Sequence, residues 1–439
     1  MSNSLNRRTL IKAGAGAAGA AALGVSKRST VFAAPAVIQE TGSKVKVVFW
    51  SSFGGKNGEI EQEVLKRFHE SQQDVEVELQ NQGSYDETAT KLIGAIQSQQ
   101  TPDFSLLSEA NWFRFYAAEA LAPMDEFISS EGVDTSDYVE SFLTEGQRNG
   151  QQWWMSFARS TPLFYYNKEK WAEAGLEDRG PKTYSELSEW GPKLVKKDGS
   201  NVTQWGFQHA PATDFIAWYF QGTVWAHGGA YSDENFNIQI TEPNAVAAGE
   251  WLKSTVAEGW AAPSADRVTD FLNGTTASMM QSTGQLSNLK SATFDFGAAF
   301  LPSEANPGCP TGGAGIAILN TAPAEKQLAA FKYIAYVTSP EITAYWSQNT
   351  GYMPVRKSAD MEAFFAENPN FKVAVDQLAT TKPQDPARRF IPGGDVIIGG
   401  GLEEITVNQA DVTATFESVK SELEDAAGPL VEELDAIEG

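Results

Sequence analysis

Hydrophobic periodicity switches repeatedly between that of a strand and that of a helix over residues 45–107, and this alternation is the strongest constraint on the fold. Three short apolar runs are typical of strands, and the segments between them repeat apolar residues every three or four positions, as helices do. Strand, helix, strand, helix, strand is the order of a parallel, doubly wound sheet. The predicted strands are VKVVFW (45–50), VEVEL (75–79) and DFSLL (103–107), and the predicted helices are GEIEQEVLKRFHE (58–70) and YDETATKLIGAIQSQQ (85–100).

A second α/β unit begins with the aromatic run PLFYYN (162–167), which predicts a strand. A helix follows and ends at Gly175, and Thr183 is expected to cap the next one. A chain of 439 residues is long enough for two cores, so each unit is predicted to be a separate lobe. Further helices are predicted at 241–259 and 321–341, and further strands at 276–284 and 294–302. Apolar spacing over 412–423 predicts an amphipathic C-terminal helix that packs on a lobe.

Ligands of parallel sheets bind where the strands end. In this chain those ends are expected near 50–55 and 108–111. Trp50 ends the first predicted strand and is therefore expected to face the ligand. An aromatic ring there would suit the C–H face of a sugar or polyol.

The first 36 residues predict a signal peptide that is removed on export. They hold five basic residues and no acidic residue around an Ala/Gly run, with the small residues FAAPA at the expected cleavage site. Arg7 and Arg8 match the twin-arginine export pattern. The chain is therefore expected on the periplasmic or cell-surface side of the membrane. GAGAAG (14–19) matches a dinucleotide-binding pattern by composition only, because no strand precedes it.

Catalytic and metal-binding motifs are scarce in this sequence. The three histidines are scattered, a phosphate-cradling loop with its lysine is missing, and the net charge of −23 disfavours nucleic acid. Neither a metal, a cofactor nor a catalytic residue is predicted. Carboxylates are so numerous that an exported glycoside- or phosphodiester-hydrolysing enzyme remains the alternative to a binding protein.

Four runs together resemble one family, the extracytoplasmic solute-binding proteins of ABC sugar importers, with the glycerol-3-phosphate-binding branch most similar. They are VVFWSSFGG (47–55), STPLFYYNKEKWAEAGLEDRGPKTYSELSEW (160–190), TGGAGIAIL (311–319) and WSQNTGYMPVRKS (346–358). The resemblance implies a type II periplasmic-binding-protein fold, α/β throughout, with a ligand cleft between two lobes. It implies lobe one at 44–159 and 315–350, and lobe two at 160–314 and 351–439.

The same resemblance implies a set of ligand contacts. Glu109 would accept hydrogen bonds from hydroxyl groups, and Arg389 would bind a phosphate with its guanidinium fork. The remaining positions would supply hydroxyl groups, an aromatic face or a backbone N–H. Besides Trp50, the implied ligand-binding residues are Tyr85, Glu109, Ser160, Ser282 or its neighbour Thr283, Gly313, Tyr352 and Arg389.

Departures from that branch leave the ligand open between glycerol-3-phosphate, a glycerophosphodiester and a phosphate-free sugar. The segment GFQHAPATDFIAW (206–218) carries His209, Asp214 and Trp218 where the branch has a tryptophan-rich stretch. Arg388, next to Arg389, is the alternative position for the phosphate-binding arginine. The resemblance implies a monomer that delivers its ligand to the transmembrane subunits of a permease, and a chemosensory role would share the same fold.

Overall fold

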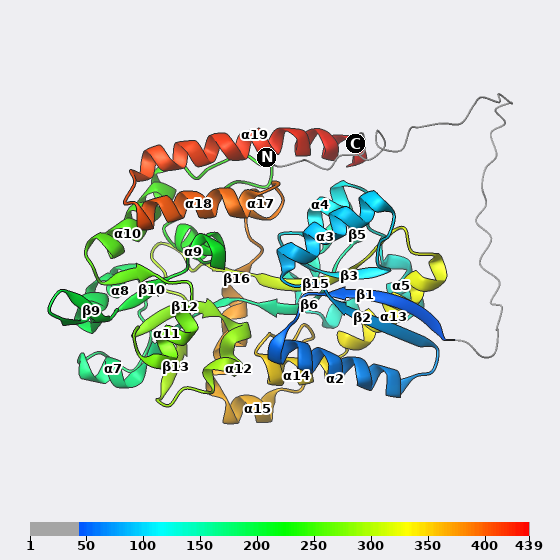
Figure 1. The fold of residues 1–439 in the computed structure, drawn as a ribbon, viewed down its shortest axis with the longest axis horizontal. Helices are drawn as coiled ribbons and strands as arrows, with labels where there is room; N and C mark the ends of the chain where they lie inside the picture. The colour runs from blue at the N-terminus through cyan, green and yellow to red at the C-terminus, as the bar shows by residue number, and fades with distance from the viewer. Residues whose placement is uncertain (1–43, 439) are drawn as a thin grey trace.

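The computed structural model describes residues 44–438, which form two α/β lobes side by side (Figure 1). The expected signal peptide lies outside the described residues. All six elements predicted before residue 168 are present, and Thr183 caps the helix at Tyr184–Trp190 by accepting from the Glu186 backbone N–H. The first lobe holds β1 (Val45–Ser51), α2 (Gly55–Ser71), β2 (Val75–Asn81), α3 (Tyr85–Ser98), β3 (Phe104–Ser108), α4 (Trp112–Ala117), α5 (Asp125–Ser130), α6 (Glu140–Thr144), β6 (Met155–Ser160), β15 (Gly312–Ile318), α13 (Ala324–Val337) and α14 (Pro340–Thr350).

The second lobe is built from the chain that follows β6. It holds β7 (Pro162–Asn167), α7 (Lys168–Glu173), α8 (Tyr184–Trp190), β10 (Phe207–His209), α9 (Ile216–Ala226), α10 (Pro243–Ala257), β11 (Ala261–Pro263), α11 (Arg267–Asn273), β12 (Ser278–Ser282), α12 (Leu286–Leu289), β13 (Phe296–Ala299), α15 (Glu362–Glu367), α16 (Pro369–Asp376) and α18 (Gly394–Val407). Two short strands, β14 (Cys309–Pro310) and β16 (Thr381–Lys382), pair between the lobes, and α17 (Pro386–Arg389) follows β16.

Each lobe contains one five-stranded sheet with a single strand that runs against its neighbours. The orders are β2-β1-β3-β15-β6 and β11-β10-β12-β7-β13. β15 is antiparallel to β3 and β6, and β7 is antiparallel to β12 and β13. Both strands begin directly after the chain has crossed from the other lobe. They therefore start at the lobe boundary, where β3 and β12 end, and this places loops from both sheets around one space.

Aromatic side chains fill the space between sheet and helices. In the first lobe the rings of Phe49 and Phe104 stack with centroids 4.6 Å apart. In the second lobe Trp171 is fully buried, and its indole donates to the Arg179 carbonyl at 3.1 Å. Trp171 therefore has a structural role, because its buried indole has both apolar neighbours and an acceptor.

The C-terminal helix α19 (Val412–Glu438) contacts both lobes, although its apolar spacing predicted packing on one lobe. Its first turns bury Phe416 and Leu423 against α10 and α18. Its last turns bury Leu430 and Leu434 against the aromatic side chains of α4. In Figure 1 it runs along the top of the molecule from one lobe to the other.

The last turn of α19 is also held by charge. The Glu438 carboxylate accepts from Arg148 Nε at 2.7 Å and Nη2 at 2.8 Å, and from the Tyr116 hydroxyl at 2.7 Å. Pro429 lies inside the helix, after Gly428. Proline lacks the N–H that would bond to the carbonyl four residues earlier, so the helix is weakest where it passes between the lobes.

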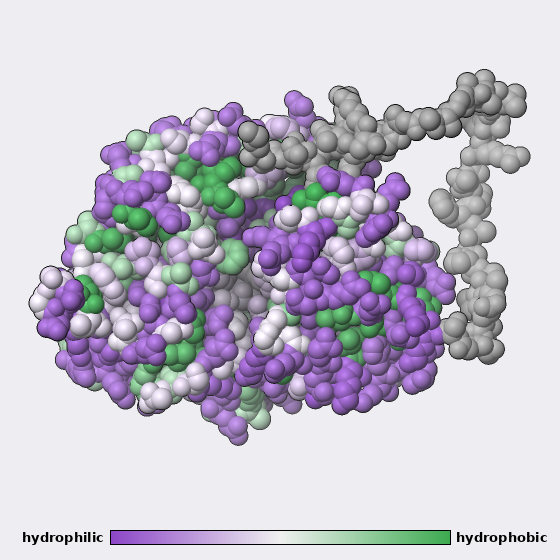
Figure 2. All heavy atoms as spheres, viewed as in Figure 1, coloured by the Kyte–Doolittle hydropathy of each residue, from purple (hydrophilic) through white to green (hydrophobic). Residues whose placement is uncertain are grey.

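The face of the molecule shown in Figure 2 is mostly hydrophilic. Within residues 44–438, none of the helices has the length and apolar character needed to cross a membrane.

Candidate functional site

A cavity of about 430 Å³ lies between the lobes and takes its walls from both. This volume is in the range of small-molecule binding sites. Lobe one contributes the start of α3, the loop after β3 and the start of α4. Lobe two contributes the start of α9, the end of β12 and the start of α18, and α17 closes the space between them.

Seven of the eight ligand-binding residues expected from the sequence line this one cavity. They come from segments far apart in the chain, and the crossing strands bring them together. They are Tyr85, Glu109, Ser160, Ser282, Gly313, Tyr352 and Arg389. Thr283, the alternative to Ser282, is outside the lining and fully buried, where its hydroxyl accepts from the Thr161 backbone N–H at 3.4 Å.

Trp50 is the eighth, and the structure does not bring it to the cavity. Its indole donates to the Gln80 side chain at 3.0 Å, and its ring packs against the cluster under α3. Side chains alternate between the two faces of a strand, and Trp50 lies on the face that α3 covers. The expectation that Trp50 faces the ligand is therefore wrong, and the ring has a structural role.

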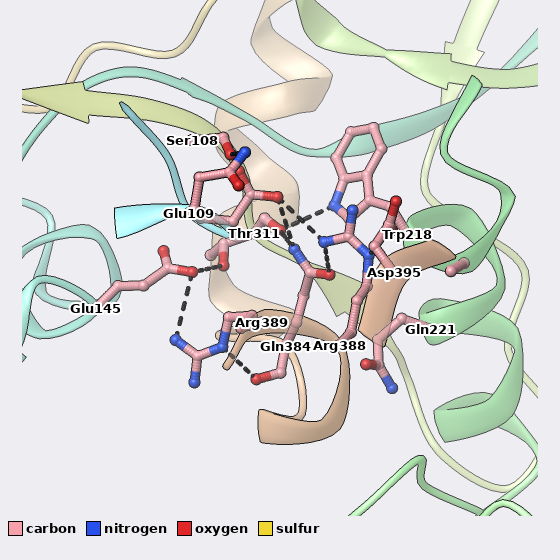
Figure 3. A network of polar contacts seen from close by, with 12 residues as sticks. Ser108, Glu109, Glu145, Trp218, Gln221, Thr311, Gln384, Arg388, Arg389 and Asp395 are labelled. Atoms are coloured by element: carbon pink, nitrogen blue, oxygen red, sulfur yellow. Dashed lines mark hydrogen bonds and ion pairs between the residues drawn. The ribbon is translucent and has the colours of Figure 1, made fainter. Parts of the chain in front are cut away.

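Glu109 is a buried carboxylate held by partners from outside its own lobe. Its Oε1 accepts from Arg388 Nη1 and from Gln384 Nε2, both at 3.2 Å, and its backbone N–H donates to the Gly313 carbonyl at 3.1 Å. Arg388 Nε donates to Asp395 at 2.6 Å. Figure 3 shows Arg388 between Glu109 of lobe one and Asp395 at the start of α18, so its charge is matched on both sides.

Arg389 has a different set of partners. Its Nε donates to the Gln384 carbonyl at 2.7 Å, and its Nη1 lies 3.7 Å from Glu145 Oε1 (Figure 3). Glu145 is shared, because it also pairs with Arg159 and accepts from the Thr311 hydroxyl at 3.0 Å. Burial lowers the pKa of Arg389, and the nearby Glu145 carboxylate opposes that shift. Arg389 is therefore less fully paired than Arg388 while facing the same cavity.

Two tyrosines from different segments meet in the cavity wall. The hydroxyls of Tyr85 and Tyr352 lie 3.2 Å apart, and the Tyr352 ring stacks on Trp346 with an interplanar angle of 17°. Burial is the main cause that raises the pKa of both phenols, which therefore stay neutral hydrogen-bonding groups. Ser84 positions Tyr85 through a capping box with Glu87 at the start of α3.

Gly313 lies where β15 enters the first sheet and has a backbone φ of +98°. A Cβ atom at this position would lie 2.1 Å from the Ala158 carbonyl oxygen on β6. Because a β-carbon fits neither the backbone angle nor the space, glycine is required.

We expect Gly313→Ala to lower the free energy of unfolding by about 1–3 kcal/mol, because β15 must move away from β6 to admit the methyl group. Urea denaturation followed by tryptophan fluorescence measures this. Gly199→Ala is the matched control, since Gly199 also has a positive φ (+60°) but open space around its Cβ position. An equal loss in both variants would contradict the close contact with β6.

The cavity wall in the second lobe includes residues from the segment 206–218, where the sequence differs from the glycerol-3-phosphate-binding branch. Asp214 pairs with Arg267 at 2.5 Å, and Phe215 has a φ of +60°. The Trp218 indole donates to the Thr311 carbonyl at 2.9 Å. His209 is outside the cavity lining, where it bonds to the Thr255 hydroxyl, and burial lowers its pKa to about 3.

Sequence reasoning missed several cavity residues. Arg114 is hidden in the aromatic run WFRFY, which is typical of core, whereas Asn111 lies in the segment 108–111 that was expected near the ligand. Asp395 is the second residue of α18 and follows Gly393, whose φ of +76° marks a turn. Within residues 44–438, groups of His, Cys, Asp and Glu suited to a metal ion are not found.

Comparison with known proteins agrees with this geometry. Residues 63–373 match the family described as "Bacterial extracellular solute-binding protein". The crystal structure of UgpB from Mycobacterium tuberculosis in complex with glycerophosphocholine is 44% identical, with a TM-score of 0.83, and the match covers 89% of this chain and all of that one.

Two further relatives extend the comparison. The sn-glycerol-3-phosphate-binding periplasmic protein UgpB of Yersinia pestis is 25% identical over 77% of this chain and 81% of its own length. The cyclic alpha-maltosyl-1,6-maltose binding protein of Arthrobacter globiformis is 20% identical with a TM-score of 0.74, over 89% of this chain and all of its own, which shows the shared fold. The chain belongs to the bacterial extracellular solute-binding proteins.

Proposed function

We propose that the interlobe cavity binds a glycerophosphodiester, with glycerol-3-phosphate as a smaller ligand of the same class. The chain is the extracellular solute-binding component of an ABC importer, as its family and relatives show. The observation that carries the ligand is the pairing, in one cavity, of a fixed carboxylate at Glu109 with an incompletely paired guanidinium at Arg389.

The two ends of such a ligand match these two groups. A glycerol moiety offers hydroxyl donors, and the Glu109 carboxylate is an acceptor held in place by Gln384 and Arg388. A phosphodiester offers anionic oxygens, which a guanidinium fork binds in bidentate fashion. The hydroxyls of Ser160 and Ser282 and the phenols of Tyr85 and Tyr352 complete the polar lining.

Binding would favour the arrangement in which both lobes touch the ligand. Loops from both sheets line the cavity, so a ligand there gains contacts in the arrangement where the lobes meet and loses them when the lobes separate. A ligand shifts such an equilibrium only by its difference in affinity for the two arrangements. The bound form is then what the permease would receive, and the ligand would leave unchanged, without turnover.

Calorimetry and thermal denaturation of the exported chain with glycerophosphocholine, glycerol-3-phosphate and maltose test the proposal. At 100 times its Kd a ligand stabilises by about 2.7 kcal/mol, so a rise in Tm is expected with both phosphate compounds. Maltose is the control and is expected to leave Tm unchanged. Stabilisation by maltose alone would overturn the phosphate assignment, and phosphorus NMR showing hydrolysis of glycerophosphocholine would make the chain an enzyme.

A further inference from the structure

Three arginines line the cavity, and they differ in how their charges are matched. Arg388 pairs with Glu109 and Asp395, and Arg389 lies 3.7 Å from Glu145. Arg114 is the third residue of α4 and lines the same cavity. The Arg114 side chain has one hydrogen-bond acceptor among the described residues, the neutral side-chain oxygen of Asn111. Within residues 44–438, no carboxylate lies within ion-pair distance of Arg114.

The Arg114 side chain is fixed in place although it forms no ion pair with any of the described residues. Asn111 donates to Asp86 at 2.9 Å and to Ser108 at 2.9 Å, which points its oxygen at Arg114. The Nε of Arg114 is buried without a hydrogen-bond partner. Burial lowers the pKa of Arg114, opposed by the nearby Asp86. Burying a guanidinium without an ion pair costs free energy, and an anion bound in the cavity would offset that cost.

We infer that Arg114 is a specificity-determining residue that binds an anionic group, such as a carboxylate, on the second alcohol of a glycerophosphodiester. This rests on the proposed function: Glu109 and Arg389 bind the glycerol and phosphate, and the rest of the 430 Å³ cavity receives the second alcohol. A carboxylate accepts two hydrogen bonds from one guanidinium, which makes this pairing directional as well as attractive.

Two ligands that differ by a single carboxylate isolate this contact. Glycerophosphoserine and glycerophosphoethanolamine share the glycerol, the phosphate and the ammonium group, so effects of Asp86 or Asp214 on the ammonium are common to both. Hydrogen bonds to charged groups contribute enough that we expect glycerophosphoserine to bind about tenfold more tightly to the unmodified chain, as measured by calorimetry.

Substitutions then assign the difference to Arg114. Arg114→Gln is expected to bring the ratio of the two Kd values to about 1, and Arg114→Lys to retain part of it. Lys66→Gln is the matched control, because Lys66 is exposed on α2 of the same lobe and its loss removes the same charge far from the lining. This variant should keep the full ratio.

The outcomes separate this inference from the function on which it rests. Equal affinity of the unmodified chain for the two ligands overturns the role of Arg114, as does an undiminished ratio in Arg114→Gln. Failure of both ligands, of glycerophosphocholine and of glycerol-3-phosphate to bind overturns the proposed function itself. Should Arg114→Gln fail to fold, Arg114→Lys supplies the comparison: a ratio smaller than that of Lys66→Gln supports the role of Arg114, and an undiminished ratio overturns it.

Discussion

Replacing Glu145 with glutamine is expected to lower the free energy of unfolding by about 3–5 kcal/mol, the largest stability effect of any single change considered for this chain. The side chains of Glu145 and Arg159 are both fully buried, and two nitrogens of Arg159 already lack partners. Glutamine keeps the shape of glutamate and removes only its charge. Arg159 would then be a buried cation with neutral acceptors alone, and Arg389 would lose its only nearby carboxylate within ion-pair distance among residues 44–438.

Urea denaturation of the exported chain measures this loss. Glu63→Gln is the control, because Glu63 forms a partly exposed pair with Arg67 on the surface of α2, and such surface pairs contribute little. We expect an unchanged midpoint for Glu63→Gln. A loss below about 1 kcal/mol for Glu145→Gln would show that water or a neighbouring group already compensates Arg159.

The second large effect concerns ligand affinity. Arg389→Ala is expected to weaken the binding of glycerophosphocholine by about 10- to 100-fold, because a charge-assisted hydrogen-bonding group to the phosphate contributes about 1.5–3 kcal/mol. Arg388→Ala is the informative comparison. Its charge is already matched by Glu109 and Asp395, so its loss should release Glu109 and weaken the binding of the glycerol end.

The two variants are separated by the ligand that each one affects. The affinities for glycerol-3-phosphate and glycerophosphocholine are measured with free glycerol as a competitor. Arg389→Ala is expected to weaken binding through the phosphate, and Arg388→Ala through the glycerol hydroxyls. Were Arg388→Ala to abolish the preference for phosphate while Arg389→Ala retained it, the phosphate-binding arginine would be Arg388.

Local pattern was sufficient for most of the fold. The strand and helix periods before residue 108, the Thr183 cap and the apolar stripe of the last helix depend on neighbours within a few residues, and the structure contains them all. The position of α19 across both lobes could not be predicted this way. Its C-terminal turns face partners on α4 and at Arg148, about 300 residues earlier in the chain.

The candidate site shows the same limit. The prediction for Trp50 was wrong because the position of a residue along a strand shows only which end of the sheet it is near. Which face of the sheet is covered depends on the helix packed against it, here α3. Arg388 and Arg389 are equivalent in sequence and are distinguished by their ion-pair partners. Two of these partners, Glu109 and Glu145, are distant in the chain, and Asp395 is nearby but reaches Arg388 only through the turn before α18. Arg114 lies in an aromatic run, so its exposure to the cavity depends on how α4 is turned against the lobe.

The helix α19 gives the two lobes one more mechanical link than the crossing segments provide. Leu430, Leu434 and Glu438 are seated in lobe one, while Phe416 and Leu423 are seated in lobe two. Any rotation that separates α4 from α18 must therefore either bend the helix at Gly428–Pro429 or pull its last turns from their seat. We therefore expect a rotation of the lobes about α19 to require less free energy than a movement that increases the distance between α4 and α18.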